Sequence, residues 1–383
     1  MKKILISVLA FDVGKSGIAD YIISVCRELS KRHKLELLIH PSDAEIFPVK
    51  NPNIAFTFVA EYLKKPLFSM FWHLYILPFL IKNDEYDLIL LPAGNRRLFA
   101  RFPAQTVVTF HDLAQYYVPD KYDRFRMFYV KTIIPHYLRK APIVMAISEN
   151  TKNDLIKYYN LPLELIEVNY NGYNAEELKT DLSEADIRQV YNLQRPYFLY
   201  NSRIEHPVKN HLHLIRAFEL LPDDVKENYD IVFTGIESRG SKEVFDYVKG
   251  SLVKNNIKFL GYVDSNYMGA LYKYADLYLF PSLYEGFGIP LLEAMACGIP
   301  VLCSNRSSLP EIGGDAVVTF DPEMHADIAA KILKVLNNPD LRHRMIERGL
   351  ERVKHFSWQN HVEKMMSLVE TKPKNRKRTN SEN

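Results

Sequence analysis

Glu285-Gly-Phe-Gly-Ile-Pro-Leu-Leu-Glu293 is the stretch of this sequence that points most directly to a fold. The apolar segment before it, Ala275-Asp-Leu-Tyr-Leu-Phe280, is typical of a buried strand. The glycines then form a turn that opens a short helix, so Glu285 lies at the carboxyl end of a strand, where open α/β sheets bind ligands. A strand, a turn and a helix in this order indicate a parallel sheet covered by helices.

The chemistry of this turn suits a ligand that carries both phosphates and hydroxyl groups. The backbone amides of Phe287, Gly288 and Ile289 can point at an anion at the helix start, and glycine lets phosphate oxygens approach closely. The carboxylates of Glu285 and Glu293 accept several hydrogen bonds and donate none when ionised. A nucleotide sugar combines phosphates with many hydroxyl groups.

Length and composition narrow the class of protein. A chain of 383 residues exceeds what one hydrophobic core usually supports, which predicts two domains. With 47% hydrophobic and 25% charged residues the chain is globular, and a net charge of +3 is too small to imply a nucleic-acid partner. Cys26, Cys297 and Cys303 lack metal-ligand spacing, so we expect buried free thiols in a reducing compartment.

Strand and helix patterns alternate in both halves of the chain, which predicts two parallel sheets. In the first half, strands are expected at 3–9, 34–39, 53–58, 87–91, 105–110, 142–147 and 164–168, and helices near 17–32, 67–82, 122–139 and 149–159. In the second half, strands are expected at 197–201, 229–234, 257–260, 275–280 and 299–303, and helices near 209–220, 241–255, 265–273, 289–296 and 324–336. The polar stretch 172–196 is the best linker candidate, and helical patterns at 339–354 and 358–370 close the chain.

Three segments bear on contact with membranes. The apolar start of the chain imitates a signal peptide, but Asp12 ends the apolar run without a cleavage site, which favours a first strand. No uncharged run reaches the roughly 18 residues of a membrane-spanning helix, so we expect a cytoplasmic protein, with peripheral contact to the inner face of the cell membrane left open. The aromatic stretch Tyr62–Leu80 fits an interfacial helix or one packed on the sheet. The tail Lys372–Arg378, with five positive charges in seven residues, fits a solvated disordered end or an anionic-membrane contact.

Several further motifs occur in one order along the chain: Ser16-Gly-Ile-Ala-Asp-Tyr21, Thr109-Phe-His111-Asp112-Leu113, Ala146-Ile-Ser-Glu-Asn150, Asn171-Gly172, Arg203 with Lys209-Asn210, 285–293 and Cys303–Glu311. This ordered set closely resembles the retaining glycosyltransferases of family 4, and most of all bacterial mannosyltransferases that build surface polysaccharides. The resemblance extends from Ser16 to about residue 360. One departure is the loop Ile204–Val208, which is one residue longer than the common pattern.

The resemblance implies the GT-B fold, with two Rossmann-like domains facing across a cleft. The expected N-terminal, acceptor-side domain is 1–180, and the expected C-terminal domain for the nucleotide sugar is 190–357. A helix at 358–371 would return to the N-terminal domain, followed by a disordered basic tail, 372–383.

The resemblance also implies roles for single residues. Arg203 and Lys209 would bind the donor diphosphate, Glu293 the ribose hydroxyls, and Glu285 and His111 the donor sugar. The full expected set is Glu285, His111, Arg203 and Lys209 for catalysis, and Gly17, Arg203, Lys209, Gly286, Phe287, Gly288, Ile289 and Glu293 for donor binding. The residues alone leave alternatives open: Arg203 and Lys209 as surface charges beside Glu205, and His111 as a structural histidine. Asp112 is expected to cap the segment that follows it.

The implied activity is retaining transfer of a hexose, with GDP-mannose as the favoured donor. The acceptor is expected to be a growing, polyprenyl-linked glycan of lipopolysaccharide O-antigen or capsule. The acceptor hydroxyl would attack from the side on which the diphosphate leaves, so no protein nucleophile is required. Two cations can replace a divalent ion on the diphosphate, so neither a metal nor a cofactor is expected. The alternatives are an inactive sugar-nucleotide-binding subunit of a glycan-assembly complex and a sugar-nucleotide epimerase of the same fold.

Overall fold

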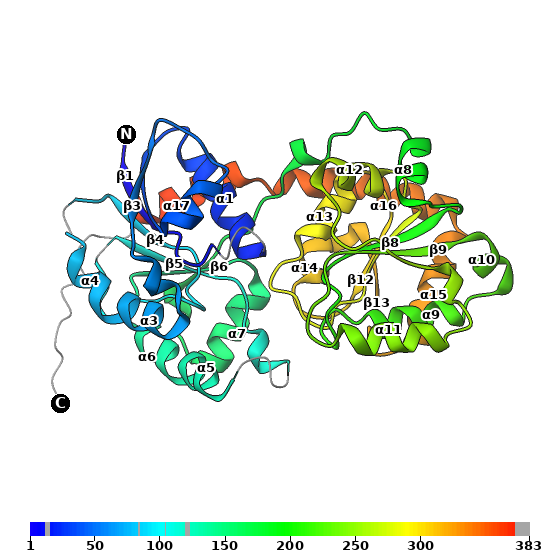
Figure 1. The fold of residues 1–383 in the computed structure, drawn as a ribbon, viewed down its shortest axis with the longest axis horizontal. Coiled ribbons are helices and arrows are strands. Elements are labelled where there is room, and N and C mark those ends of the chain that lie inside the picture. The colour runs from blue at the N-terminus through cyan, green and yellow to red at the C-terminus, as the bar shows by residue number, and fades with distance from the viewer. Residues whose placement is uncertain (12–15, 83–84, 104, 119–122, 372–383) are drawn as a thin grey trace. The chain divides into compact units, whose positions relative to one another are not determined.

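The chain folds into two compact units, each built on its own parallel sheet (Figure 1). The computed structural model describes residues 1–11, 16–82, 85–103, 105–118 and 123–371. Unit 1 is Met1–Gly172 together with the segment that begins at Ser357, and unit 2 is Tyr173–Phe356. The basic tail, 372–383, lies outside the described residues.

Unit 1 holds seven strands in the order β3-β2-β1-β4-β5-β6-β7. The strands are β1 (Lys3–Ser7), β2 (Lys34–Ile39), β3 (Ile54–Phe58), β4 (Leu88–Leu91), β5 (Thr106–Phe110), β6 (Ile143–Ala146) and β7 (Ile166–Val168). The helices are α1 (Gly17–Leu29), α2 (Pro41–Ile46), α3 (Pro66–Phe71), α4 (Leu77–Leu80), α5 (Arg124–Phe128), α6 (Ile134–Leu138), α7 (Glu149–Tyr159) and α17 (Trp358–Thr371).

Unit 2 holds six strands in the order β10-β9-β8-β11-β12-β13. The strands are β8 (Tyr197–Asn201), β9 (Asp230–Thr234), β10 (Ile257–Phe259), β11 (Leu277–Phe280), β12 (Val301–Ser304) and β13 (Val317–Phe320). The helices are α8 (Glu184–Tyr191), α9 (His211–Glu219), α10 (Asp223–Asn228), α11 (Ser241–Gly250), α12 (Ser265–Lys273), α13 (Ile289–Ala296), α14 (Leu309–Gly313), α15 (His325–Leu336) and α16 (Pro339–Arg352).

The two sheets share one topology. In each, the strand order runs outward from the first strand of the unit and then reverses, between β1 and β4 and between β8 and β11. Neighbouring described strands pair in parallel, and residues along the central strands β4 and β11 are buried on both faces. The α/β class with two parallel sheets is therefore confirmed. The reversal points are where such sheets bind ligands, beyond the carboxyl ends of the strands.

Some elements of unit 2 were not predicted from the sequence. The expected linker 172–196 contains helix α8, which begins with a capping box formed by Ser183 and Asp186 and buries Ile187. Strand β13, at the edge of the unit 2 sheet, was not expected at all.

The expected helices 67–82 and 122–139 are each interrupted by a π-helical turn, η3 (Trp72–Ile76) and η5 (Tyr129–Ile133). In each case a proline, Pro78 or Pro135, follows in the next α-helical segment. Proline cannot donate the backbone hydrogen bond of a regular helix, so the preceding turn widens.

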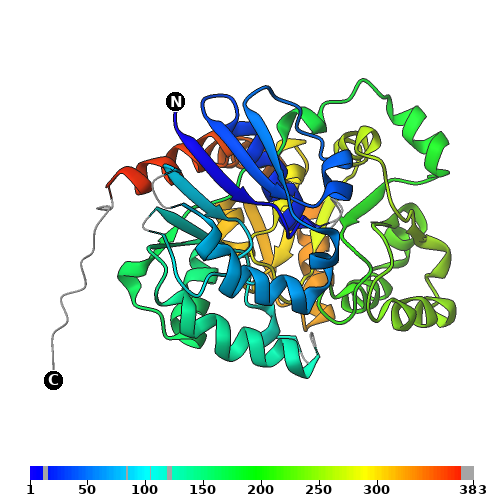
Figure 2. The same ribbon diagram turned by 60° about the vertical axis from the view of Figure 1, so that its left-hand side comes forward.

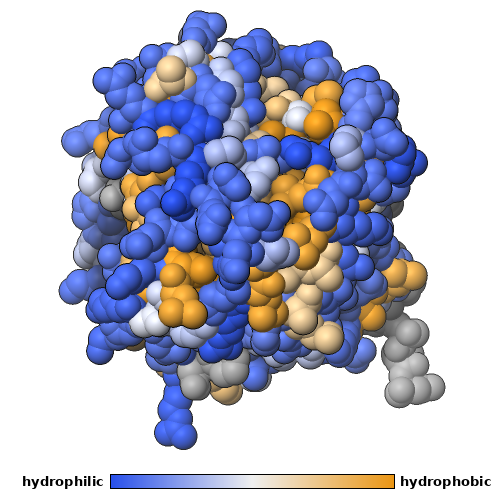
Figure 3. Space-filling model, turned by 90° about the vertical axis from the view of Figure 1, so that its right-hand side faces the viewer, coloured by the Kyte–Doolittle hydropathy of each residue, from blue (hydrophilic) through white to orange (hydrophobic). Residues whose placement is uncertain are grey.

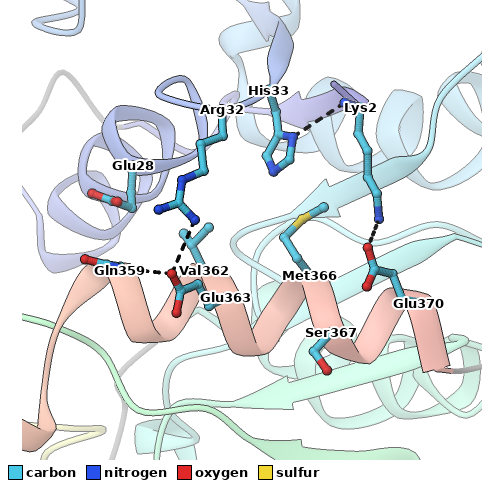
Figure 4. A pocket seen from close by; sticks show the side chains of 10 residues that line it. All are labelled: Lys2, Glu28, Arg32, His33, Gln359, Val362, Glu363, Met366, Ser367 and Glu370. Atoms are coloured by element: carbon cyan, nitrogen blue, oxygen red, sulfur yellow. Dashed lines mark hydrogen bonds and ion pairs between the residues drawn. The ribbon is translucent and has the colours of Figure 1, made fainter.

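Helix α17 belongs to unit 1 and lies beside α1, as the turned view also shows (Figure 2). A pocket of about 260 Å³ opens between α17, the end of α1 and the start of β1 (Figure 4). Ion pairs cross it from Lys2 to Glu370 at 2.5 Å and from Arg32 to Glu363 at 3.4 Å. These pairs, together with the buried side chains of α17, hold the last helix on unit 1.

The described part of the chain contains no helix that is both long and apolar enough to cross a bilayer. Figure 3 shows one face of the molecule, on which patches of hydrophobic side chains lie among hydrophilic ones. Scattered apolar residues are normal on protein surfaces, so such patches alone do not mark a binding site.

Candidate active site

Lys209 and Glu285 meet at the carboxyl edge of the unit 2 sheet. Lys209 follows β8, Glu285 follows β11, and these two strands are neighbours at the reversal of strand order. The Nζ atom of Lys209 lies 2.6 Å from Oε1 of Glu285, and the two side chains are only 17% and 15% exposed. The sequence predicted both residues for one site, and the structure brings them into contact.

Hydrogen bonds tie the loop that carries Lys209 to the loop that carries Glu285. The amide of Leu283 donates to the carbonyl of Val208 at 2.9 Å, and the buried Tyr200 hydroxyl donates to the carbonyl of Lys209 at 2.8 Å. Asn210, in the left-handed conformation at φ 58°, donates from Nδ2 to the carbonyl of Pro281 at 3.0 Å. Hydrogen bonds to backbone carbonyl oxygens therefore fix the positions of the two loops that carry the lysine and the glutamate.

Gly288 makes the turn between β11 and α13 possible. Its φ of +102° lies in the left-handed region that favours glycine, and a Cβ there would come within 2.8 Å of Leu309 Cδ2. The hydroxyl of Ser308 lies 3.0 Å from the carbonyl oxygen of Glu285, and Ser307 Oγ accepts the Glu285 amide at 2.9 Å. The turn is thus held from the loop after β12, with Gly286 and Ile289 half-exposed at its ends.

Glu293 is half-exposed on α13 although Leu292 and Ala294 beside it are buried. A carboxylate in such surroundings needs hydrogen-bond donors to offset its desolvation. The hydroxyl of the buried Tyr272 on α12 supplies one, since it donates to Glu293 Oε2 at 2.8 Å.

Arg203 is placed differently from Lys209. It lies in the loop after β8, its side chain is 54% exposed, and its Nη2 pairs with Glu205 Oε2 at 3.0 Å. This is the pairing that the residues alone left open as a surface alternative. The long, exposed side chain can still change rotamer toward a ligand at the sheet edge.

His111, expected in the sugar site, is a buried histidine directly after β5 in unit 1. Its Nε2 lies 2.6 Å from the carbonyl oxygen of Pro92, and because a carbonyl only accepts, Nε2 carries the proton. Burial lowers the pKa of His111 to about 4, so the ring is neutral at neutral pH. Its Nδ1 is then the nitrogen that can accept a hydrogen bond.

Gly17 is the first residue of α1, which Ser16 caps by accepting the amide of Ala19 at 3.3 Å. Among the described residues, a Cβ built on Gly17 would meet nothing within 4 Å. Packing against the described residues of unit 1 therefore does not explain why this position is glycine.

One smaller expectation is confirmed and another only in part. Asp112 accepts the amide of Ala114 at 3.0 Å and so caps the segment that follows. The three cysteines are free thiols, as expected, but only Cys26 and Cys303 are buried, and Cys297 is partly exposed. Burial raises the pKa of the Cys297 thiol to about 12.

Comparison with known proteins identifies the family. The family model described as glycosyl transferases group 1 matches residues 183–352, and the model described as glycosyltransferase family 4 matches residues 15–177. The chain belongs to glycosyltransferase family 4. The residues of the unit 2 site, Lys209, Glu285 and Glu293, all lie within the group 1 match.

Curated relatives of this glycosyltransferase include two mannosyltransferases of Escherichia coli. O-antigen chain mannosyltransferase B is 33% identical over 258 residues, which is 67% of this chain and 68% of that protein. The serotype-specific mannosyltransferase WbdA is 29% identical over 295 residues, which is 75% of this chain but 35% of that protein.

Solved structures share the fold. HepE of Anabaena in complex with UDP and glucose has a TM-score of 0.72 at 19% identity, over 97% of this chain and 100% of that one. Sucrose-phosphate synthase of Thermosynechococcus elongatus has a TM-score of 0.74 at 19% identity, over 97% of this chain and 98% of that one. The fold of this glycosyltransferase is GT-B, as expected.

The sequence did not single out the residues that hold the site together. Tyr200 and Tyr272 are buried tyrosines in a strand and a helix of ordinary composition, so no local pattern distinguishes them. Ser307 and Ser308 lie inside the quoted motif Cys303–Glu311, and the φ of 53° at Ser307 marks a tight turn that the serines alone do not reveal.

Proposed function

We propose that this glycosyltransferase transfers a hexose, with retention of configuration, from a nucleotide diphosphate sugar to a growing lipid-linked glycan of a surface polysaccharide. The favoured donor is GDP-mannose and the favoured product is lipopolysaccharide O-antigen, in line with the E. coli mannosyltransferases that resemble the chain. The observation that carries the proposal is the Lys209–Glu285 pair at the carboxyl edge of the unit 2 sheet.

Lys209 binds the donor diphosphate through its positive charge. Its ammonium group pairs with the carboxylate of Glu285, which occupies the position of an anionic ligand. An arriving diphosphate competes for this ammonium group and leaves Glu285 free to contact the sugar. Arg203, from its exposed position, adds a second positive charge as the diphosphate departs.

The transfer needs no protein nucleophile. The acceptor oxygen forms its bond to the anomeric carbon while the bond from that carbon to the diphosphate oxygen breaks. The acceptor proton passes to the departing diphosphate oxygen on the same face of the sugar. Positioning and charge stabilisation by Lys209 and Arg203 then supply the catalysis, without a metal ion.

His111 and Gly17 serve the donor from unit 1. A neutral His111 offers Nδ1 as an acceptor for a sugar hydroxyl, and its low pKa excludes it as a proton donor at neutral pH. At Gly17 the lack of a packing reason for glycine suits a close approach of the ligand to the backbone.

A membrane contact for the lipid-linked acceptor is supported by one helical segment of unit 1, 66–80. Large apolar side chains recur on its outward side, and we call them the aromatic stripe: Leu67, Phe68, Phe71, Tyr75, Ile76, Phe79 and Leu80, which are 39% to 70% exposed. Its inward side is apolar as well, with Met70, Leu74 and Leu77 buried.

The buried side also carries Ser69 and His73, but the exposed side is apolar, and a contiguous apolar surface of this kind is typical of an interaction site. Tyr75 of the stripe lies against Tyr137, with ring centroids 6.2 Å apart, so α6 runs beside it. In α5, which continues through η5 into α6, Phe125 and Phe128 are more than half exposed, next to the exposed Arg124. Aromatic side chains with nearby cations fit the surface of an anionic bilayer.

Co-sedimentation with vesicles tests this contact. The intact chain is expected to bind anionic vesicles at low salt and to lose binding at high salt, since a Debye length of roughly 8–10 Å limits the attraction. Phe71→Asp with Phe79→Asp should abolish binding, whereas a chain ending at Thr371 should only weaken it. Equal binding by the stripe variant would contradict the proposal.

A donor screen tests the activity. Purified protein is incubated with GDP-mannose and a panel of other nucleotide sugars, and release of the nucleoside diphosphate is followed. Release of GDP from GDP-mannose supports the proposal. An isomerised nucleotide sugar indicates an epimerase, and binding without turnover indicates an inactive subunit; either result overturns it.

A further inference from the structure

A line of side-chain hydrogen bonds runs along the carboxyl edge of the unit 2 sheet and ends on Glu293. Thr234, the last residue of β9, donates from Oγ1 to Asn201 Oδ1 at 2.8 Å. Asn201, the last residue of β8, donates from Nδ2 to the hydroxyl of Tyr272 at 3.0 Å. Tyr272 donates to Glu293 Oε2 at 2.8 Å.

The direction of every bond in this line follows from the glutamate. An ionised carboxylate only accepts hydrogen bonds, so the hydroxyl of Tyr272 must donate its one hydrogen bond to Glu293. The tyrosine oxygen then only accepts, so Asn201 must present its NH₂ group and not its oxygen. The Asn201 oxygen in turn accepts the hydroxyl proton of Thr234. One arrangement satisfies all four side chains.

Burial makes this arrangement costly to change. Tyr272 is fully buried and Thr234 is 1% exposed, so a hydrogen-bonding group left without its partner there stays desolvated. Desolvation, reinforced by the charge of Glu293, raises the pKa of Tyr272 well above 10, which keeps the hydroxyl protonated. The line is therefore a fixed donor aimed at Glu293.

We propose that Tyr272, held by Asn201 and Thr234, is the positioning residue that orients the Glu293 carboxylate toward the hydroxyl groups of the donor nucleoside. The inference rests on the proposed function, and on the role in ribose binding that the family resemblance implies for Glu293. Glu293 is half-exposed on α13, and a pair of neighbouring hydroxyls on a ligand needs one orientation of its carboxylate. The strand ends of the sheet thereby set the geometry of nucleoside recognition.

The test compares two tyrosine variants. Tyr272→Phe removes the hydroxyl that orients Glu293. Tyr197→Phe is the matched control, because its buried hydroxyl donates to the backbone oxygen of Leu271, the residue before Tyr272, also at 2.8 Å. Both changes delete one hydroxyl of a buried tyrosine in unit 2 that donates a hydrogen bond of the same length.

We expect Tyr272→Phe to weaken binding of GDP and UDP, whichever the wild type binds, by about tenfold, the range for a hydrogen bond to a charged group. The KM for the donor should rise by the same factor while kcat at saturating donor stays unchanged. Tyr197→Phe should keep wild-type affinity and KM, even if both variants melt at a lower temperature.

Glu293→Gln separates this inference from the function on which it rests. Loss of affinity in Glu293→Gln with wild-type affinity in Tyr272→Phe overturns the positioning role and leaves the proposed function standing. Equal loss in Tyr272→Phe and Tyr197→Phe also overturns it, because the effect is then one of stability. Wild-type affinity in Glu293→Gln removes Glu293 from the nucleotide site and overturns this inference alone, whereas failure of the donor screen overturns the function on which it rests.

Discussion

Units 1 and 2 order their strands in the same way, yet the carboxyl edges of their sheets carry different chemistry. At the unit 2 edge, Lys209 and Glu285 form an ion pair from two loops, and Glu293 on α13 accepts a hydrogen bond from Tyr272. At the unit 1 edge, the expected site residue His111 is neutral and bonded to a carbonyl oxygen. Unit 1 instead carries the exposed aromatic stripe, which extends over α3, η3 and α4.

The difference shows how one topology can serve two kinds of ligand. A charged edge suits a nucleotide diphosphate, whose phosphates and ribose need cations and carboxylates. An apolar helix surface suits a substrate that is presented at a bilayer. The proposal therefore places the nucleotide of the donor on unit 2 and the lipid-linked acceptor on unit 1, and the following experiments test this division.

The largest effect is expected from the cations of unit 2. Lys209→Ala and Arg203→Ala should each lower turnover by about 100-fold or more, because negative charge builds on the diphosphate as its bond to the sugar breaks. Steady-state rates at saturating donor measure this effect. Normal turnover in both variants would show that these side chains lie outside the site.

Substitution of Glu293 should affect nucleotide binding, whereas substitution of Glu285 should affect turnover. Glu293→Gln should weaken GDP binding by about tenfold, since it removes acceptor capacity for the ribose. Glu285→Gln should lower turnover but bind GDP at least as well as the wild type, because Lys209 loses its competing carboxylate. Calorimetry with GDP alone decides between these outcomes, and equal loss of affinity in both variants contradicts the division of roles.

Alanine at the glycines of the two units should act in opposite ways. Gly288→Ala should destabilise unit 2 by about 1–3 kcal/mol, because φ is positive and Leu309 lies in the way. Gly17→Ala should leave the melting temperature unchanged and lower transfer, since only a ligand would meet the new methyl group. Thermal unfolding and turnover, measured on both variants, test this pair; destabilisation by Gly17→Ala would be inconsistent with an open position.

Acid should weaken unit 1 before unit 2. Burial lowers the pKa of His111 and His361 to about 4 and of His73 to about 3 in unit 1, and that of His211 to about 3 in unit 2. Because these rings take up protons near pH 6.5 only when unfolded, their stabilisation is complete above that pH and is lost as the pH falls toward 4.

As the pH falls from 7 to 5.5, each such histidine should lower the free energy of unfolding by about 1 kcal/mol. Hydrogen exchange followed by mass spectrometry resolves the two units. Faster exchange should spread through unit 1 first as the pH is lowered, and His361→Gln should reduce this sensitivity. If unit 2 opens first, buried histidines do not set the acid response.

Local patterns predicted most of this fold. Helices 265–273 and 289–296 were predicted at their observed bounds; in the structure Asp264 caps the first, and the turn at Gly288 precedes the second. Helix α8 was missed because it buries little besides Ile187, although its capping box is visible in the sequence. The prolines that follow the π-turns can be read from the sequence. The hydrogen bonds that shift to accommodate them cannot, because they depend on packing.

The sequence predicted which residues belong to the candidate site, but it did not predict which of them contact one another. Strand ends and glycines located Lys209, Glu285 and Glu293, since parallel sheets gather such positions at one edge. Neither the Lys209–Glu285 pair nor the link from Thr234 to Glu293 could be predicted, because residues far apart in the chain meet only once the sheet order is known.

Binding of GDP by three proteins tests the central claim, that unit 2 holds the nucleotide, most directly. Calorimetric titrations compare the wild type with Lys209→Ala in unit 2 and His111→Gln in unit 1. GDP has no sugar, so its affinity should be unchanged in His111→Gln and at least tenfold weaker in Lys209→Ala. Wild-type affinity in Lys209→Ala together with a loss in His111→Gln would contradict the assignment of the donor to unit 2.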